Sequence, residues 1–140
     1  MKWLRVLKQE KGSQLLEFIL ISPLLWLLFL FAFDQFTIMF NRQKALEAAY
    51  EAGRIAAVMP NAGLAKYHGK KRGEESLKEA IAVESSEVTF ETNGGWSKGN
   101  HMKAKAYIRF HLLASGEPFE VEESYAMMIE NAEDNRDDRD

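Results

Sequence analysis

Residues 18–33 form a run of sixteen uncharged amino acids, FILISPLLWLLFLFAF, and this run constrains the fold more than any other feature. Leu15 and Leu16 extend it on the N-terminal side, across a single carboxylate at Glu17. A bilayer core needs about 20 apolar residues in a helix, whereas the core helix of a soluble protein is shorter and shows a polar face. Because no polar face is visible, the sequence predicts a transmembrane helix over about residues 15–40.

Basic residues flank the apolar run unevenly. Four precede it, Lys2, Arg5, Lys8 and Lys11, and two follow it, Arg42 and Lys44. Because cytoplasmic flanks favour lysine and arginine, we expect a single-pass protein of the cell membrane, with its N-terminus in the cytoplasm and residues 41–140 outside. A cleaved secretory signal peptide is the competing interpretation, but the run is long for such a signal and no small-x-small site closes it.

The predicted helix continues beyond the membrane, through an alanine-rich extension over residues 41–60. Small residues recur in it at spacings of three and four, at Ala45, Ala48, Ala49, Ala52 and Ala56. Such a stripe lets a second helix approach closely, which favours packing against a neighbouring helix. Alternatively, alanine is present as the best helix former and the stripe packs on the chain's own sheet. Both interpretations stay open, and Pro60 is expected to end a helix that spans residues 13–60.

Residues 61–129 predict a small αβ head outside the membrane. The glycines and the basic cluster of residues 65–75 indicate an exposed loop, and residues 74–84 indicate a short amphipathic helix. Apolar and polar residues then alternate in three stretches, residues 86–92, 101–111 and 119–128, with turn residues between them. The expected fold class is therefore α+β, with a long N-terminal transmembrane helix, a short helix and an antiparallel sheet of about three strands. The acidic stretch of residues 130–140 is expected to be disordered.

The composition excludes several kinds of chemistry. The chain has no cysteine, which excludes disulfides, thiolate nucleophiles and cysteine-ligated metals, and its net charge of −3 does not favour nucleic acid as a partner. His101 and His111 lie ten residues apart on one predicted strand and are too far apart to share a metal. The motifs of phosphate-binding loops, zinc proteases and serine hydrolases are missing. We therefore expect no catalytic residue, no metal and no cofactor, and hence a protein that is not an enzyme.

Three polar or helix-breaking positions interrupt the apolar run. A proline inside a helix removes one backbone hydrogen bond, so Pro23 is expected to kink the helix, which membrane helices tolerate. Asp34 and Gln35 are expected at the outer membrane interface or, alternatively, against a partner helix.

Glu17 is the most unusual residue of the run, because an unpaired carboxylate in hydrocarbon costs several kcal/mol. One explanation places it at the interface, where its side chain reaches the head groups. The other supposes a cut after Gly12, which would give Ser13 a new terminal ammonium group. In a neighbouring copy shifted by about one helical turn, Glu17 would then accept that ammonium. Such a pair would also set the register between copies, since mispaired neighbours would leave buried charges.

The stretch KGSQLLEF resembles the processing motif of type IV prepilins: a short basic leader, a glycine, four residues, then glutamate, phenylalanine and a hydrophobic helix. Over residues 11–58 the chain is similar to the TadE-like family, the pilin-like components of tight-adherence (Flp-type) pilus systems. The positions that carry this similarity are Gly12, Glu17, Phe18, Pro23, the leucine-rich run, Arg42-Gln43 and the alanine-rich block with Arg54. Type IV pilins proper usually have their helix proline further along, and mature Flp pilins are far shorter than this chain.

This resemblance implies a minor pilin or pseudopilin that takes part in assembly of a Tad/Flp-type pilus or a related secretion or adhesion apparatus. A prepilin peptidase would remove the leader, residues 1–12, between Gly12 and Ser13. Glu17 and Phe18 would act in assembly and register. The expected partners are this peptidase, membrane lipid and other pilin-like subunits, which would contact the N-terminal helix and the stripe of Ala45, Ala49, Ala52 and Ala56. The protein would then stay in the membrane or enter an extracellular filament.

Two other interpretations remain open. The first is a permanently anchored extracytoplasmic binding domain, which is not processed and whose helix only tethers the head. The second is a membrane-bound hydrolase, against which the missing motifs argue. The N-terminal residue of the mature protein separates the first of these from the pilin-like interpretation.

Overall fold

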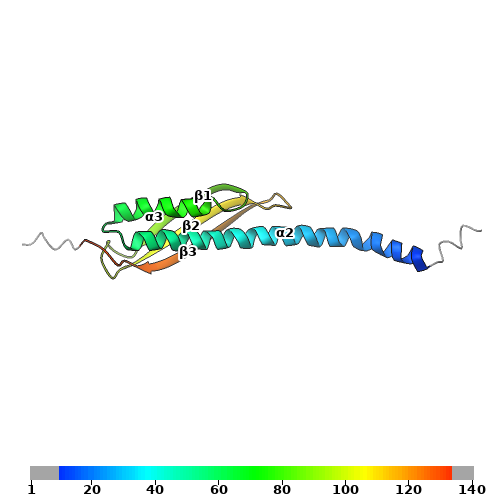
Figure 1. Ribbon diagram of the computed structural model, residues 1–140, viewed down its shortest axis with the longest axis horizontal. Coiled ribbons are helices and arrows are strands. Elements are labelled where there is room, and N and C mark those ends of the chain that lie inside the picture. Colours follow the sequence, from blue (N-terminus) through cyan, green and yellow to red (C-terminus); the bar gives the residue numbers. More distant parts are fainter. Residues whose placement is uncertain (1–9, 134–140) are drawn as a thin grey trace, which may run out of the picture.

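The computed structural model describes residues 10–133, which form a long helix with a small head packed around its C-terminal half (Figure 1). The elements in chain order are α2 (Glu10–Ala57), α3 (Ala62–Leu77), β1 (Val83–Thr92), β2 (His101–His111) and β3 (Pro118–Met128). The predicted α+β class, with a long N-terminal helix, a short helix and three antiparallel strands, is confirmed. The first nine residues of the predicted leader and the last seven of the predicted tail lie outside the described residues.

Helix α2 has 48 residues, which corresponds to about 72 Å at the standard rise. It continues through Pro23 as one ribbon (Figure 1). It ends at Ala57, and Met59, whose helical conformation Pro60 disfavours, lies outside the helix. The observed helix therefore starts and ends three residues earlier than the predicted range of 13–60.

The predicted short helix after α2 is present, but its predicted limits were wrong. Residues expected to form a loop belong to α3, and residues 78–82, expected to be helical, form the turn that leads to β1. The Asn61 side chain caps α3 by accepting a hydrogen bond of 2.9 Å from the backbone N–H of Leu64. Gly69 and Gly73 lie four residues apart on the buried face of α3, where the missing side chains let the helix approach α2 and β1 closely.

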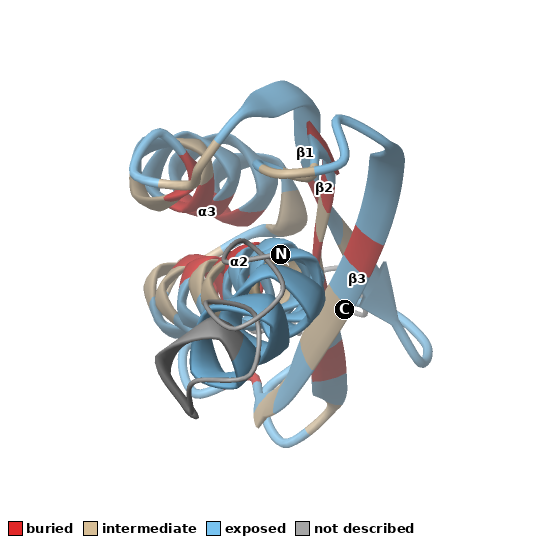
Figure 2. Ribbon diagram, turned by 90° about the vertical axis from the view of Figure 1, so that its right-hand side faces the viewer, coloured by how far each residue is buried: buried red, intermediate tan, exposed pale blue. Residues whose placement is uncertain are grey.

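The three strands form one antiparallel sheet in the order β1-β2-β3. Figure 2 shows the sheet on one side and the two helices on the other, with the buried residues between these layers. Helix α2 packs on β2 and β3, and α3 packs on β1. The predicted alternation of β2 is confirmed, because one set of its side chains is buried: Met102, Ala104, Ala106, Ile108 and Phe110.

The alanine stripe of α2 lies inside this core. All of its members are fully buried: Ala45, Ala48, Ala49, Ala52 and Ala56. They pack together with residues of the sheet and of α3. Of the two interpretations of the stripe, the structure therefore shows packing within the chain's own head.

The segment after β3 is ordered for longer than the sequence predicted. Ile129 is fully buried, and the backbone N–H groups of Glu130 and Glu133 donate hydrogen bonds of 2.9 Å to the carbonyls of Ala57 and Pro60. The last carbonyls of a helix lack partners within the helix, so the contact with Ala57 satisfies a group that the end of α2 leaves free, and the contact with Pro60 holds the segment to the turn after it. Disorder predicted from residue 130 onwards is thus wrong for residues 130–133.

Candidate functional site

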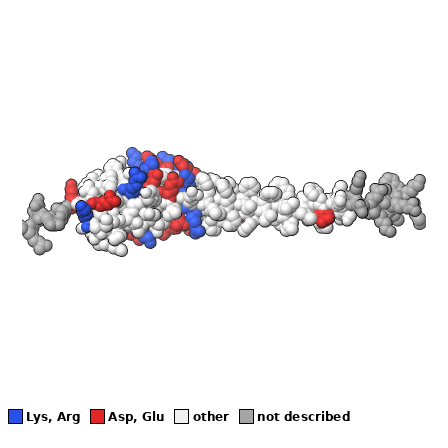
Figure 3. All heavy atoms as spheres, turned by 60° about the horizontal axis from the view of Figure 1, so that its bottom comes forward, with Lys and Arg blue, Asp and Glu red and all other residues white. Residues whose placement is uncertain are grey.

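The N-terminal part of α2, residues 13–33, projects from the head with nearly all of its residues exposed, and we call this part the shaft (Figure 1). Figure 3 shows it as an almost entirely uncharged surface, in contrast to the charged head. Its most apolar 18-residue window has a mean hydropathy of 2.4, and none of that window is buried. Among the described residues, α2 is the one helix that is long and apolar enough to cross a membrane. The shaft therefore fits a single-pass membrane anchor.

The residues predicted to act in processing and assembly all lie at the start of the shaft. Helix α2 begins at Glu10, so the Gly12–Ser13 bond lies in its first turn. Ser13 and Glu17 are exposed and lie four residues apart, which places them about one turn from each other on the same face. Within the described part of the chain, no ion pair or hydrogen bond involves the Glu17 carboxylate. Phe18 is exposed to 67% and lies next to Glu17 along the helix.

Pro23 lies inside the helical part of the shaft. The helix does not break there, and the kink expected from the lost backbone hydrogen bond stays a prediction.

Asp34 is the residue at which the shaft meets the head. One of its carboxylate oxygens accepts hydrogen bonds from the backbone N–H groups of Ala114, at 2.9 Å, and Ser115, at 3.3 Å. These two residues belong to the hairpin between β2 and β3, so the carboxylate fixes the hairpin to α2. The sequence predicted Asp34 at the membrane interface or against a partner helix, and it did not indicate this contact with the hairpin.

Asn41, two turns further along α2, makes a second connection of this kind. Its side chain is fully buried and donates a hydrogen bond of 2.9 Å to the carbonyl of Ile81. It also accepts one of 2.8 Å from the backbone N–H of Ile81. The turn that follows α3 is thereby held to α2 at a point where the next residue, Ala82, has a positive φ of 54°.

The sequence contained a signal for both connections. Asp34, Thr37 and Asn41 follow one another at spacings of three and four residues, and the same helical face continues into the alanine stripe. Thr37 is fully buried, and its hydroxyl donates a hydrogen bond of 2.9 Å to the carbonyl of Phe33. A polar stripe at helical spacing on an otherwise apolar helix thus indicates where the head begins.

The arginines quoted for the family resemblance lie on the head. Arg42 forms an ion pair of 2.8 Å with Glu123 of β3, which links α2 to the edge strand of the sheet. Arg54 lies exposed in the last turn of α2, beside Glu51 and Arg72. Neither arginine lies near the shaft, so both belong to the junction between α2 and the rest of the head.

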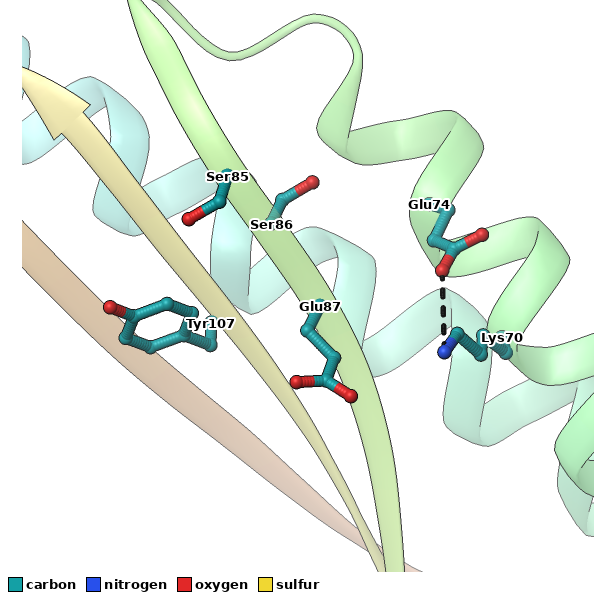
Figure 4. A pocket seen from close by; sticks show the side chains of 6 residues that line it. All are labelled: Lys70, Glu74, Ser85, Ser86, Glu87 and Tyr107. Carbon is teal, nitrogen blue, oxygen red and sulfur yellow. Dashed lines mark ion pairs between the residues drawn. The ribbon is translucent and has the colours of Figure 1, made fainter.

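The head surface carries a polar hollow of about 330 Å³ between α3 and the sheet (Figure 4). It is lined by Lys70, Glu74, Ser85, Ser86, Glu87 and Tyr107. Lys70 and Glu74 pair with each other along α3 at 3.7 Å, and the hydroxyls of Ser85 and Ser86 point in different directions, as expected for successive strand residues. The hollow therefore does not bring a hydroxyl and a base into the geometry of a nucleophilic site. Residues 13–133 contain no group of three or more His, Asp and Glu side chains that could hold a metal ion.

Comparison with known proteins bears on the shaft and its junction with the head. A family model described as "TadE: TadE-like protein" matches residues 12–54. No curated protein and no solved structure matches the chain. The matched segment contains the Gly12–Ser13 bond, Glu17, the whole shaft and the face of α2 that carries Asp34, Asn41 and most of the alanine stripe. The resemblance inferred from the motif is thereby confirmed: over residues 12–54 the chain is similar to the TadE-like family.

Proposed function

We propose that this protein is a minor pilin or pseudopilin that takes part in assembly of a Tad/Flp-type pilus or a related secretion or adhesion apparatus. The observation that carries the proposal is the bare shaft, whose only charge is a carboxylate one turn after the expected cleavage bond, within the segment that matches the TadE-like family. In this proposal the shaft crosses the cell membrane, the head lies outside, and a prepilin peptidase removes residues 1–12.

Cleavage after Gly12 would give Ser13 a terminal ammonium group. Four residues of helix rise by about 6 Å, so a neighbouring copy shifted along the axis by that amount has its Glu17 at the level of this ammonium. In hydrocarbon each group alone is costly, and a contact between them offsets part of that cost. The pair therefore favours one axial register over others, which is what an assembly of identical helices requires.

The burial of the alanine stripe changes which surface we expect other subunits to contact. Ala45, Ala49, Ala52 and Ala56 are covered by the chain's own sheet and α3, so they are not accessible to a neighbouring helix while the head is folded. Contacts between copies would instead use the exposed large side chains of the shaft. The proposed partners through this surface are other pilin-like subunits and membrane lipid.

Mass spectrometry of the chain extracted from native membranes tests the processing step. We expect wild-type protein to begin at Ser13 and Gly12→Leu to retain the leader, because a bulky side chain replaces the small residue before the cleaved bond. Gly63→Ala, a change in α3, serves as the control and should still begin at Ser13. A native product that starts at Met1 would refute processing and would support the anchored binding domain instead.

Co-purification with tagged pilus subunits tests the role of Glu17. Glu17→Gln keeps the size of the side chain but removes its charge, so it should insert into the membrane normally and join the assembly poorly. Glu17→Asp keeps the charge and should join better than the glutamine variant. Equal recruitment of wild type and Glu17→Gln would show that the carboxylate does not pair with a neighbouring copy.

A further inference from the structure

We propose that the hairpin between β2 and β3, residues 112–117, is a second membrane contact, in which Leu113 enters the lipid interface beside α2. This inference rests on the membrane insertion of the shaft proposed above. It assigns a lipid-binding role to a segment of the head that lies some eighty residues from the shaft in the sequence.

The position of the hairpin is the first observation. Figure 1 shows it as the part of the head that reaches furthest along α2 toward the N-terminus. Its backbone is hydrogen-bonded to the Asp34 carboxylate through Ala114 and Ser115. The hairpin therefore lies at the level where the shaft emerges from the head.

The length of the shaft places this level relative to a bilayer. Residues 13–33 rise by about 31 Å, which matches a hydrocarbon core of about 30 Å. Asp34 then lies at the outer edge of the core, and the head-group region extends roughly 5–8 Å further along the helix. A hairpin held against Asp34 lies within this region.

The exposed apolar surface does not stop where the shaft ends. Phe36 and Met39 of α2 are exposed to 54% and 70%, and Leu113 at the tip of the hairpin is exposed to 53%. These three residues form what we call the apolar collar. The first charged residue of α2 beyond Asp34 is Arg42, and its ion pair with Glu123 lies above the collar, on the side away from the shaft. Phe36 and Met39 continue the exposed apolar surface of the shaft along α2, whereas Leu113 is brought to the same level by the contact of its neighbour Ala114 with Asp34. Lipid is the occupant that would cover both.

The fold also keeps Leu113 outside the core of the head. The hairpin is closed by hydrogen bonds from the backbone N–H of Leu112 to the carbonyl of Glu117, at 2.9 Å, and from Gly116 to the carbonyl of Leu112, at 3.0 Å. Leu112 packs against the core of the head, whereas its neighbour Leu113 is left outside. With the helix and the hairpin both in contact with lipid, the head is held in one orientation over the membrane surface.

Because the chain has no cysteine, single cysteines can carry a spin label without background. We would label Leu113→Cys, Leu25→Cys in the shaft and Leu64→Cys at the start of α3, whose native leucines are exposed to 53%, 44% and 41%. The full chain is placed in vesicles of phosphatidylcholine and phosphatidylglycerol, and collision rates with oxygen and with a water-soluble nickel chelate are measured by electron paramagnetic resonance.

We expect the label at position 25 to show the signature of the hydrocarbon core and the label at position 64 that of water. The label at position 113 should collide with nickel several-fold less often than that at position 64. If positions 113 and 64 behave alike while position 25 is in hydrocarbon, the second contact is refuted and the proposed membrane anchor stands. If position 25 is itself in water, both the second membrane contact and the proposed membrane anchor are refuted. Protection of position 113 that appears only at a high protein-to-lipid ratio would mean contact with a second copy and would also overturn the proposal.

A second pair of variants tests the positioning of the hairpin by Asp34. In the Leu113→Cys background, Asp34→Ala removes the acceptor of both backbone hydrogen bonds and should raise nickel collisions toward the level at position 64. Asp34→Asn keeps a carbonyl oxygen at the same place and should preserve most of the protection. Unchanged protection in Asp34→Ala would show that Asp34 does not hold the hairpin against the lipid.

Discussion

Gly69 of α3 provides a sharp test of the packing between the two helices. Replacing an interior helical glycine by alanine normally stabilises a helix by about 1 kcal/mol. At Gly69 the added Cβ would lie 2.6 Å from Cζ of Phe90 and 2.9 Å from the backbone carbonyl oxygen of Ala52. The second of these atoms belongs to the backbone of α2 and cannot move aside without shifting that helix. Gly69→Ala should therefore destabilise the head in spite of its higher helix propensity.

The size of the effect follows from the two opposing contributions. Overpacking of a well-filled core costs about 1–3 kcal/mol, and two simultaneous short contacts place this site in the upper part of that range. After the gain of about 1 kcal/mol in helix propensity, a net loss of about 1–2 kcal/mol remains. For a head of this size, such a loss lowers the midpoint of thermal unfolding by roughly 4–16 °C.

Thermal unfolding of the full chain in detergent, followed by circular dichroism, measures this shift. Gly63→Ala is the matched control, because it lies in the same helix and its Cβ would meet only Asn61 Oδ1, at 3.4 Å. The control should unfold at the wild-type temperature or slightly above it. If Gly69→Ala is as stable as Gly63→Ala, the close approach of α3 to α2 is not what stabilises the head.

Two further predictions concern the connections between α2 and the turn after α3. Asn41→Ala removes both hydrogen bonds to Ile81 and leaves a backbone donor and acceptor without partners, so the head should lose about 2 kcal/mol or more; a urea midpoint equal to that of wild type would contradict this. The hydrogen bond from Lys44 lowers the pKa of Glu79 below its ordinary value of 4.5, so the pair contributes stability above pH 4.5 and loses it as the pH falls through the lowered pKa. The difference in unfolding midpoint between wild type and Glu79→Gln should therefore shrink in acid, and a difference that is independent of pH would refute the pair's contribution.

The elements that follow from one regular pattern of apolar residues along the chain were predictable from the sequence. The uncharged run indicated a long exposed helix, and the alternation along β2 gave both its limits and its buried face. The short helix was predicted, but its start was placed too late because Gly69 and Gly73, together with a cluster of basic residues, are typical of loops. In the structure these glycines serve a helix–helix contact, which depends on the position of α2 and cannot be inferred from α3 alone.

The candidate site likewise contains one residue whose role the sequence indicated and one whose role it did not. Glu17 could be singled out because a charge in an apolar run is costly wherever the rest of the chain lies. The role of Asp34 could not be inferred, because its partners at Ala114 and Ser115 lie eighty residues away and only the three-dimensional fold brings them to α2. The spacing of Asp34, Thr37 and Asn41 indicated a polar face but did not identify what would cover it.

One helix forms both the shaft and the central element of the head, and it is continuous between the two parts. The shaft and the head should therefore move together as one rigid body. From residue 34 to residue 57 the helix extends about 36 Å, so a tilt of about 20° in the bilayer displaces its far end by about 12 Å. If the shaft is embedded in lipid, as proposed, a pull on it during extraction of the subunit would be transmitted along α2 to the head as displacement and rotation.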